Sequence, residues 1–522
     1  MDYNTTSTED CPPDLYGMVV ARRWLKTCQT KHPICSTAFI LTDGGCEESD
    51  VSSNPALLLP RRLLDVGPHG SEDVKLINTD TGADKEYRYL ALSHCWGDAS
   101  KVRKTTLSNL LQHCEGIQCS TLSKTFQDAI LVTQLLGFRF LWIDSLCIIQ
   151  DSREDFELEC ARMHTIYLNC DCMLSASDAR SGDEGFLTYW ERGNTGQAEG
   201  TTAPPKPRPA LDPESACTVR IRQGISWRQW STLLAGPLST RGWTFQERQL
   251  APRILHYTRH GMMWECRSCI GAGDSTVLQY RRTSHKLDDY RTISHKLDDY
   301  RKTSHKLDEQ PNPSTPRMHY VPYAKLPDLF RILDGSPAQV GEDIMAQWLS
   351  LVDDYSRRNL TFIKDKLPAI STLAAIVSYI SPEPSAYLAG VWASDLARQL
   401  YWQPKPRSSQ GRTAHAAKVF DRFPSWSWTS YNGPITYAVA EFFFTDYMYH
   451  RTEKYEPHAV FRFLSSDVRP QGHDHFGDIE GRQLDVYGEF VDDANPTFKT
   501  SNYSKHPVRS DLRVNFDDGE TH

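Results

Sequence analysis

An acid, a hydroxyl and a thiol follow directly on the apolar run FLWI at residues 140–143, as Asp144, Ser145 and Cys147. In an open α/β sheet, ligands bind at the carboxyl ends of the strands, so side chains in this position can do chemistry. Asp144 and Ser145 are therefore candidates for ligand or cofactor contact. For Asp144 we favour the alternative that it accepts hydrogen bonds from backbone and hydroxyl groups at the strand end.

A second polar group, Ser93, His94 and Trp96, follows the apolar run YLAL at residues 89–92. These side chains are candidates for lining a nucleotide pocket, with the indole of Trp96 stacked on a base. The alternative for His94 is a loop histidine held by hydrogen bonds. The two groups together predict one candidate site at one sheet edge.

His94, Asp144 and Cys147 also supply the residue types of a thiol hydrolase. Nothing in the sequence sets their geometry, and Cys147 stands between two apolar residues. We therefore interpret Cys147 as a small buried side chain.

Strands and helices alternate around these groups. Apolar runs typical of buried strands occupy 87–93, 138–143 and 171–177, and a helical pattern runs from Ser123 to Gly137. A second helical pattern lies between the last two runs. This order implies parallel strands with right-handed crossovers, so we predict an α/β fold with a parallel sheet flanked by helices.

The second helical pattern, at residues 153–169, has large side chains that recur along one face, which we expect to be buried. They are Phe156, Cys160, Met163 and Tyr167. Upstream, RRLLDV at 61–66 is expected to form an edge strand.

We divide the chain by composition into five parts, with a polar, proline-rich insertion inside the second and a tandem decapeptide repeat inside the third. The parts are a lead-in segment (1–83), the α/β domain (84–270, insertion at 192–215), a linker (271–316, repeat at 281–310), a helical subdomain (317–405) and a β-rich C-terminal region (406–522).

Charge and apolar runs limit the classes of function. The net charge is −8 and the pI is near 6.1, so we expect no nucleic-acid partner. The sequence starts without a signal-peptide pattern and has no apolar run long enough to span a bilayer, so we expect a cytoplasmic protein whose 14 cysteines are free thiols.

Two cysteine clusters could supply zinc ligands, the first of them with Cys11 and Cys46 nearby in the sequence. Cys28, His32 and Cys35 lie close together, and Cys266 and Cys269 form a CxxC pair far downstream. The first cluster has irregular spacing, and the CxxC pair has no second pair in the sequence. From the sequence alone we assign no metal ligands.

Four segments resemble, in chain order, the successive blocks of the fungal heterokaryon incompatibility (HET) domain. They are YLALSHCWG at 89–97, LGFRFLWIDSLCIIQD at 136–151, RMHTIYLNCDCMLSAS at 162–177 and LSTRGWTFQERQLAPRILHY at 238–257. Flanking segments such as RWLKTCQTKHPICS before the domain and FPSWSWTS after it are also similar to the family. The resemblance covers roughly residues 20 to 435, without the insertion and the repeat.

The resemblance implies a TIR-like fold and a role in non-self recognition, the fungal form of innate immunity. In this role, contact with an incompatible partner triggers programmed cell death. It implies a protein partner and allows self-association. A non-catalytic scaffold that keeps only the fold is an alternative.

A further alternative is enzymatic. Some TIR-like domains cleave the nicotinamide glycosidic bond of NAD with a glutamate on the helix after a central strand, and the matching position here is Glu159. NAD would then be the substrate, and we assign no cofactor. Glu247, in the fourth block, ranks second. Glu159 is otherwise a solvated carboxylate paired with Arg162, and Glu247 otherwise neutralises a neighbouring arginine.

Overall fold

The computed structural model covers all 522 residues, and the structure describes thirteen stretches of the chain. These are 13–36, 39–42, 45–48, 59–79, 87–187, 236–259, 261–272, 279–280, 344–381, 385–404, 422–437, 462–471 and 475–487. The proline-rich insertion and the decapeptide repeat lie outside them. No helix among the described residues is both long and apolar enough to cross a membrane.

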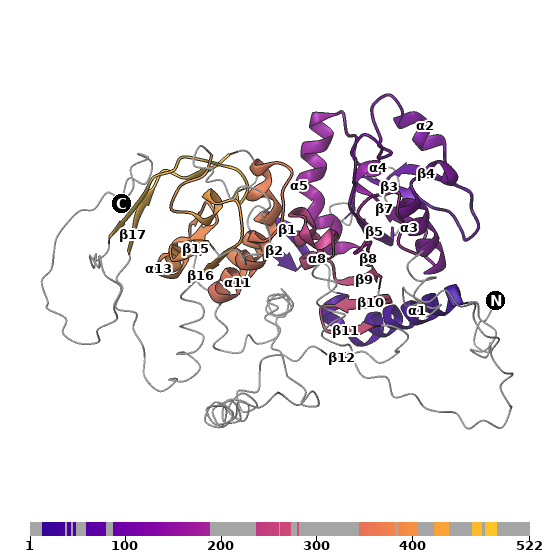
Figure 1. Ribbon diagram of the computed structural model, residues 1–522, viewed down its shortest axis with the longest axis horizontal. Helices are drawn as coiled ribbons and strands as arrows, with labels where there is room; N and C mark the ends of the chain where they lie inside the picture. Colours follow the sequence, from indigo (N-terminus) through magenta and orange to yellow (C-terminus); the bar gives the residue numbers. More distant parts are fainter. Residues whose placement is uncertain are drawn as a thin grey trace, which may run out of the picture.

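A ten-stranded sheet forms the core of the first half (Figure 1). Its four central strands are all parallel, in the order β9-β8-β5-β7. Their bounds are β9 Arg253–Thr258, β8 Cys172–Ser175, β5 Tyr89–Ser93 and β7 Phe140–Trp142. β5 and β8 are buried at every position, as their continuous apolar runs predict. The predicted α/β fold with parallel strands is confirmed.

Antiparallel strands extend the sheet on both sides, so the whole sheet is mixed. Beyond β7 lie β3 Arg62–Asp65, β4 Asp73–Asn78 and β6 Ile117–Gln118; beyond β9 lie β10 Gly261–Cys266, β11 Cys269–Ala272 and β12 Gln279–Tyr280. The prediction of RRLLDV as an edge strand was wrong. β3 pairs with both β7 and β4 and so lies inside the sheet, and its Leu63 and Leu64 are fully buried.

The helices that connect the parallel strands lie on opposite faces of the sheet. α3 (Lys124–Leu135) leads from β5 to β7, and α5 (Arg153–Asn169) leads back across β5 to β8. Right-handed crossovers in opposite directions place their helices on opposite faces. α8 (Trp243–Leu250) leads on to β9 and contacts α5. The loops after β5 and β8 therefore depart toward opposite faces, which is the topology at which open sheets form a ligand crevice.

α5 buries only part of the predicted face: Tyr167 is buried and Met163 packs against the core. Phe156 is 46% exposed, whereas Asp155, Glu159 and Ile166 are buried at spacings of four and seven residues. Asp155 accepts hydrogen bonds from the guanidinium of Arg62 and the backbone N–H of Ile149, and these contacts turn this face of the helix inward. The hydrophobic periodicity predicted burial of the apolar side chains. It could not predict the buried ion pair between Asp155 and Arg62, because Arg62 lies on a distant strand.

Short elements complete the first half. They are α1 Pro13–Lys31 with the 3-10 turn η1 Pro33–Cys35, the hairpin β1 Phe39–Thr42 and β2 Gly45–Glu48, α2 Leu110–Glu115 and α4 Asp144–Cys147. In Figure 1, α1 lies beside β10 and β11 at one end of the sheet.

The described residues from 344 to 487, which we call the C-terminal region from here on, consist of helices and small two-stranded sheets, as the sequence predicts. Its elements are α11 Ile344–Ser356, α12 Ser371–Ile380, α13 Leu396–Gln399, β13 Tyr387–Leu388 with β14 Val391–Trp392, β15 Trp402–Pro404 with β16 Ile435–Tyr437, β17 Arg462–Ser466 with β20 Leu484–Tyr487, and β18 Arg469–Pro470 with β19 Ile479–Glu480. This region packs on α8: the rings of Phe245 and Tyr355 lie 5.6 Å apart. One continuous hydrophobic core spans both halves.

Candidate functional site

The carboxyl ends of β5 and β7 carry the two predicted groups of polar residues, and they lie at the same edge of the sheet. β5 and β7 are parallel neighbours, with Ala91 opposite Trp142. The indole N–H of Trp96 donates a hydrogen bond to Oδ2 of Asp144 over 2.8 Å. The structure therefore brings together the two groups that the sequence predicted as one site.

Ser93 and Glu247 form the buried centre of this edge. The hydroxyl of Ser93 donates a hydrogen bond to Oε2 of Glu247, which reaches in from α8. Burial raises the pKa of Glu247 to about 7, and the negative charge of Asp144 adds to the rise, whereas Arg241 and the hydroxyls of Ser93 and Tyr167 oppose it. A carboxyl group with such a pKa exchanges its proton near neutral pH, which suits general acid–base chemistry.

Asp144 is occupied by local hydrogen bonds. Besides the Trp96 indole, it accepts a hydrogen bond from the backbone N–H of Ser145 over 2.6 Å. The ammonium of Lys104 lies 5.4 Å from the centre of the Trp96 ring. The Ser145 hydroxyl is buried and has no hydrogen-bond partner among the described residues. Asp144 thus has the structural contacts that we favoured for it.

His94 is buried and packs edge-on against Phe126, with the ring centres 5.1 Å apart. Burial lowers the pKa of His94, and Arg241 lowers it further, although Asp144 opposes them. Arg241 also donates a hydrogen bond to the backbone carbonyl of His94 over 3.3 Å. The imidazole is therefore neutral at physiological pH, and its Nε2 has no hydrogen-bond partner among the described residues.

Glu159 lies in different surroundings. It is fully buried, and neither carboxylate oxygen has a hydrogen-bond partner within the described part of the chain. Burial raises its pKa, and the charges of Arg62 and Arg162 oppose the rise. The interpretation of Glu159 as a solvated helix carboxylate was wrong, because the face of α5 that carries Asp155 turns inward.

Cys147 is fully buried in α4, and burial raises its pKa to about 12. The group is a neutral thiol at physiological pH, whereas the nucleophile of a thiol hydrolase is a thiolate. Its backbone carbonyl accepts a hydrogen bond from Arg62 over 2.7 Å. These observations favour a packing role.

Sequence reasoning missed a chain of buried polar side chains beside Ser93. Ser175, paired in register with Ser93, contacts Ser177 over 2.9 Å, and Ser177 lies 3.4 Å from Nδ1 of His256. Nε2 of His256 lies 2.8 Å from Oε2 of Glu265, which also accepts a hydrogen bond from Arg248 over 3.0 Å. The two serines at the end of MLSAS were the signal that the sequence offered for this chain. Their contact with His256 on β9, and through it with Glu265 on β10, depends on the order of the strands in the sheet.

The cavity at this edge has a volume of about 20 Å³ and is lined by residues that include Ser93, Ser175, Thr244 and His256. This volume holds about one water molecule. A nucleotide does not fit into it.

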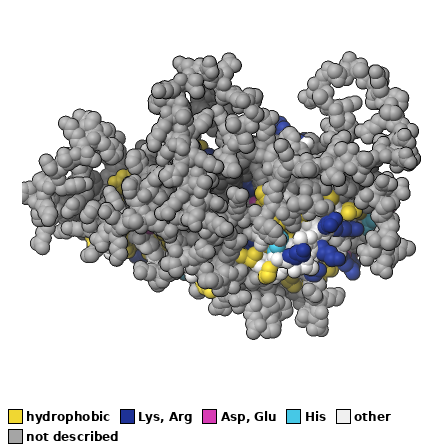
Figure 2. Space-filling view, turned by 90° about the horizontal axis from the view of Figure 1, so that it is seen from below, with side chains coloured by type: hydrophobic (Ala, Val, Ile, Leu, Met, Phe, Trp, Pro, Cys, Tyr) yellow, Lys and Arg dark blue, Asp and Glu magenta, His cyan; other side chains and the backbone are white. Residues whose placement is uncertain are grey.

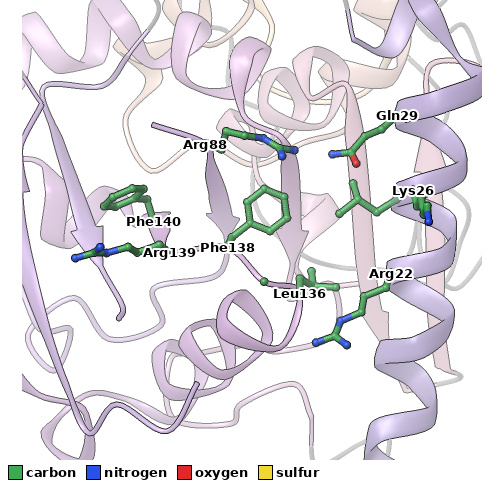
Figure 3. A pocket seen from close by; sticks show the side chains of 10 residues that line it. Arg22, Lys26, Gln29, Arg88, Leu136, Phe138, Arg139 and Phe140 are labelled. Carbon is green, nitrogen blue, oxygen red and sulfur yellow. The ribbon is translucent and has the colours of Figure 1, made fainter. Parts of the chain in front are cut away.

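A larger hollow, of about 470 Å³, lies at the opposite, amino edge of the sheet (Figure 3). It is lined by Arg22 and Lys26 of α1 and by Arg88, Phe138 and Arg139. Figure 2 shows Lys and Arg side chains gathered on this face of the molecule. Arg88 and Arg139 are already paired with Asp171 and Asp65. Because the hollow lies at the amino ends of β5 and β7, it is separate from the edge that carries Ser93 and Asp144.

Residues 89–247 match the family model described as Heterokaryon incompatibility protein (HET). Comparison with curated proteins and with solved structures gave no match. The matched segment begins at the first residue of β5 and ends at Glu247, so it contains both partners of the buried Ser93–Glu247 contact. Residues 89–247 of this chain therefore form a heterokaryon incompatibility (HET) domain.

Proposed function

We propose that this chain is a cell-death effector of fungal non-self recognition that acts by regulated association with a protein partner. The family match supports a role connected with heterokaryon incompatibility. The observation that favours association over turnover is the small size of the cavity beside Ser93, which has room for about one water molecule. Signalling through surfaces requires no open pocket.

The C-terminal region is suited to transmit a trigger to this crevice. Asn359 and the segment before α8 exchange backbone hydrogen bonds, from Gly242 N to Asn359 O over 2.8 Å and from Asn359 N to Thr240 O over 2.6 Å. The indole of Trp243 donates a hydrogen bond to Asp365 over 3.3 Å. A partner that displaces the C-terminal region would also move α8, and with it Glu247 away from Ser93.

Regulated expression of the full chain in a filamentous fungus tests this proposal. We expect growth arrest and loss of membrane integrity on induction, together with recovery of the chain in a complex larger than its 59.5 kDa monomer. A matched strain expressing Phe245→Ala, which loosens the contact between α8 and Tyr355, should show altered toxicity at equal protein level. Unimpaired growth at confirmed protein levels would contradict the proposal, and would agree with the non-catalytic scaffold.

NAD glycohydrolase activity is the second candidate, favoured by one observation: Glu247 has a pKa of about 7 and lies where the loops of β5 and β8 diverge. Cleavage of the nicotinamide bond develops positive charge on the sugar, which a nearby carboxylate stabilises. For this activity we place Glu247 ahead of Glu159, since Glu247 contacts Ser93. The crevice would have to open for NAD to enter.

Incubation of the purified chain with NAD decides this question. An enzyme that uses Glu247 loses activity in Glu247→Gln and keeps it in Glu159→Gln, which removes the charge of another buried glutamate. Loss in Glu159→Gln alone would return the role to Glu159. No consumption of NAD by the wild-type chain, in the presence or absence of the trigger, would remove the enzymatic candidate.

A further inference from the structure

Two cysteine segments that are far apart in the sequence meet at one end of the sheet. Cys28 lies in the last turn of α1, His32 directly follows this helix, Cys35 ends η1, and Cys266 ends β10. His32 and Cys266 are separated by 234 residues, yet Nδ1 of His32 lies 3.6 Å from Sγ of Cys266. Figure 1 shows α1 beside the β10–β11 hairpin.

The four side chains present one ligand atom each, and these atoms all lie within 4.8 Å of one another. All four residues are buried, with exposed fractions of 0% for Cys28, 3% for His32, 1% for Cys35 and 3% for Cys266. The three cysteines are free thiols. We propose that Cys28, His32, Cys35 and Cys266 bind one structural zinc ion, which joins α1 and η1 to the β10–β11 hairpin.

The spacing of these atoms suits tetrahedral zinc. With Zn–S bonds of about 2.3 Å and Zn–N bonds of about 2.0–2.1 Å, a tetrahedral ion holds sulfur and nitrogen roughly 3.5–3.6 Å apart. The distance between His32 Nδ1 and Cys266 Sγ agrees with this value. Three thiolates with one imidazole select zinc over magnesium or calcium, which prefer oxygen ligands. Four protein ligands leave no open position, as in structural sites.

Neighbouring groups support the charge of such a site. A zinc ion with three thiolates carries a single net negative charge, and the buried guanidinium of Arg253 offsets it by donating to Sγ of Cys28 over 3.3 Å. The backbone N–H of Cys269 donates to Sγ of Cys266 over 3.2 Å. Arg267 donates to the backbone carbonyl of Ile34 over 2.8 Å, which holds the hairpin against η1. Such outer contacts orient metal ligands.

The zinc ligands are hard to recognise in the sequence because they come from two distant segments. A closed zinc site needs four ligands, and the first cluster supplies three from a single short segment. The fourth comes from the CxxC pair, whose partners could not be identified without the pairing of β10 with β9 and the position of α1.

Metal analysis of the full chain tests the site. The chain without an affinity tag, produced in zinc-supplemented medium and purified without chelators, should contain one zinc per chain by mass spectrometry of the metal. Cys28→Ser and Cys266→Ser should each lose at least nine-tenths of it. Cys147→Ser, which alters an equally buried thiol in α4, should keep it. A wild-type chain without zinc, or full zinc retention in both ligand variants, would overturn the proposal.

A second measurement applies if the ligand variants do not fold. Wild-type chain loaded with Co²⁺ should show the visible absorption of a tetrahedral thiolate complex, and a mercurial reagent should release zinc from the native chain in step with thiol modification. Zinc that dissociates without any thiol reacting, together with no such Co²⁺ spectrum, would show adventitious metal and overturn the proposal.

Discussion

The hydroxyl of Ser93, at the end of β5, donates a hydrogen bond to Oε2 of Glu247 on α8, across 154 residues of sequence. This contact joins the central strand to the helix on which the C-terminal region packs. It also places a buried carboxyl group at the carboxyl ends of the parallel strands, where ligands bind in open α/β sheets.

The first prediction concerns pH. Burial raises the pKa of Glu247 from its ordinary value near 4.5 to about 7, so the folded state binds this proton more tightly than the unfolded state does. The resulting stabilisation of the folded state is complete below the pKa that Glu247 has in the unfolded chain, near 4.5, and is lost as the pH rises to about 7. The shift corresponds to about 3 kcal/mol of unfolding free energy.

Denaturant titrations between pH 4.5 and pH 8 measure this effect. As the pH rises across this range, the unfolding free energy of the wild type should fall by about 3 kcal/mol relative to that of Glu247→Gln, which has no titrating group at this position. Glu115→Gln, on the exposed surface of α2, is the control and should follow the wild type. Parallel curves for wild type and Glu247→Gln would contradict a buried, proton-binding Glu247.

The second prediction concerns the packing of α8 on the C-terminal region. Phe245 is fully buried, lies 5.6 Å from Tyr355 and is covered by the guanidinium of Arg358 at 4.6 Å. Phe245→Ala should lower the unfolding free energy by about 3–5 kcal/mol. Phe156→Ala is the matched control, because Phe156 is 46% exposed and its loss should cost about 0.5 kcal/mol or less. Equal losses in the two variants would refute the packing described here.

The third prediction concerns Gly97, in the loop that follows β5. Its φ is +68°, and an added Cβ would lie 2.5 Å from Cβ of Ser181. Gly137 has a φ of +83° with no heavy atom within 4 Å of an added Cβ. Gly137→Ala should therefore cost only the left-handed backbone, about 1–2 kcal/mol, and Gly97→Ala roughly 1–3 kcal/mol more because of the clash. Thermal melts of the two variants give the comparison; similar melting temperatures would show that the Gly97 loop relaxes.

The fourth prediction concerns the bond from Trp96 to Asp144. Trp96→Phe removes the indole donor that lies 2.8 Å from Oδ2 of Asp144, and should cost about 1–3 kcal/mol by leaving this acceptor unsatisfied. In a double-mutant cycle with Asp144→Ala, we expect a coupling energy of about 1 kcal/mol or more. Additive effects would mean that Asp144 is free for another contact, and would favour a ligand-binding role.

The sequence by itself determined the alternation of strands and helices and the parallel core. Continuous apolar runs such as YLAL, and helices with a clear start and stop such as the one between Ser123 and Gly137, are set by local side-chain and backbone preferences. The position of Ser93 and Asp144 at one edge follows from parallel pairing alone. These features need no knowledge of distant contacts.

Only the tertiary structure decided which carboxylate meets Ser93. Glu159 and Glu247 are both buried glutamates on helices, but only Glu247 contacts Ser93, whereas Glu159 has no hydrogen-bond partner among the described residues and lies near Arg62 and Arg162. The contact between His32 and Cys266 also depends on tertiary packing, because the two residues are 234 positions apart in the sequence. Such contacts depend on how whole helices and strands pack, and the energies that select a packing are shared by many distant residues, so no local pattern records them.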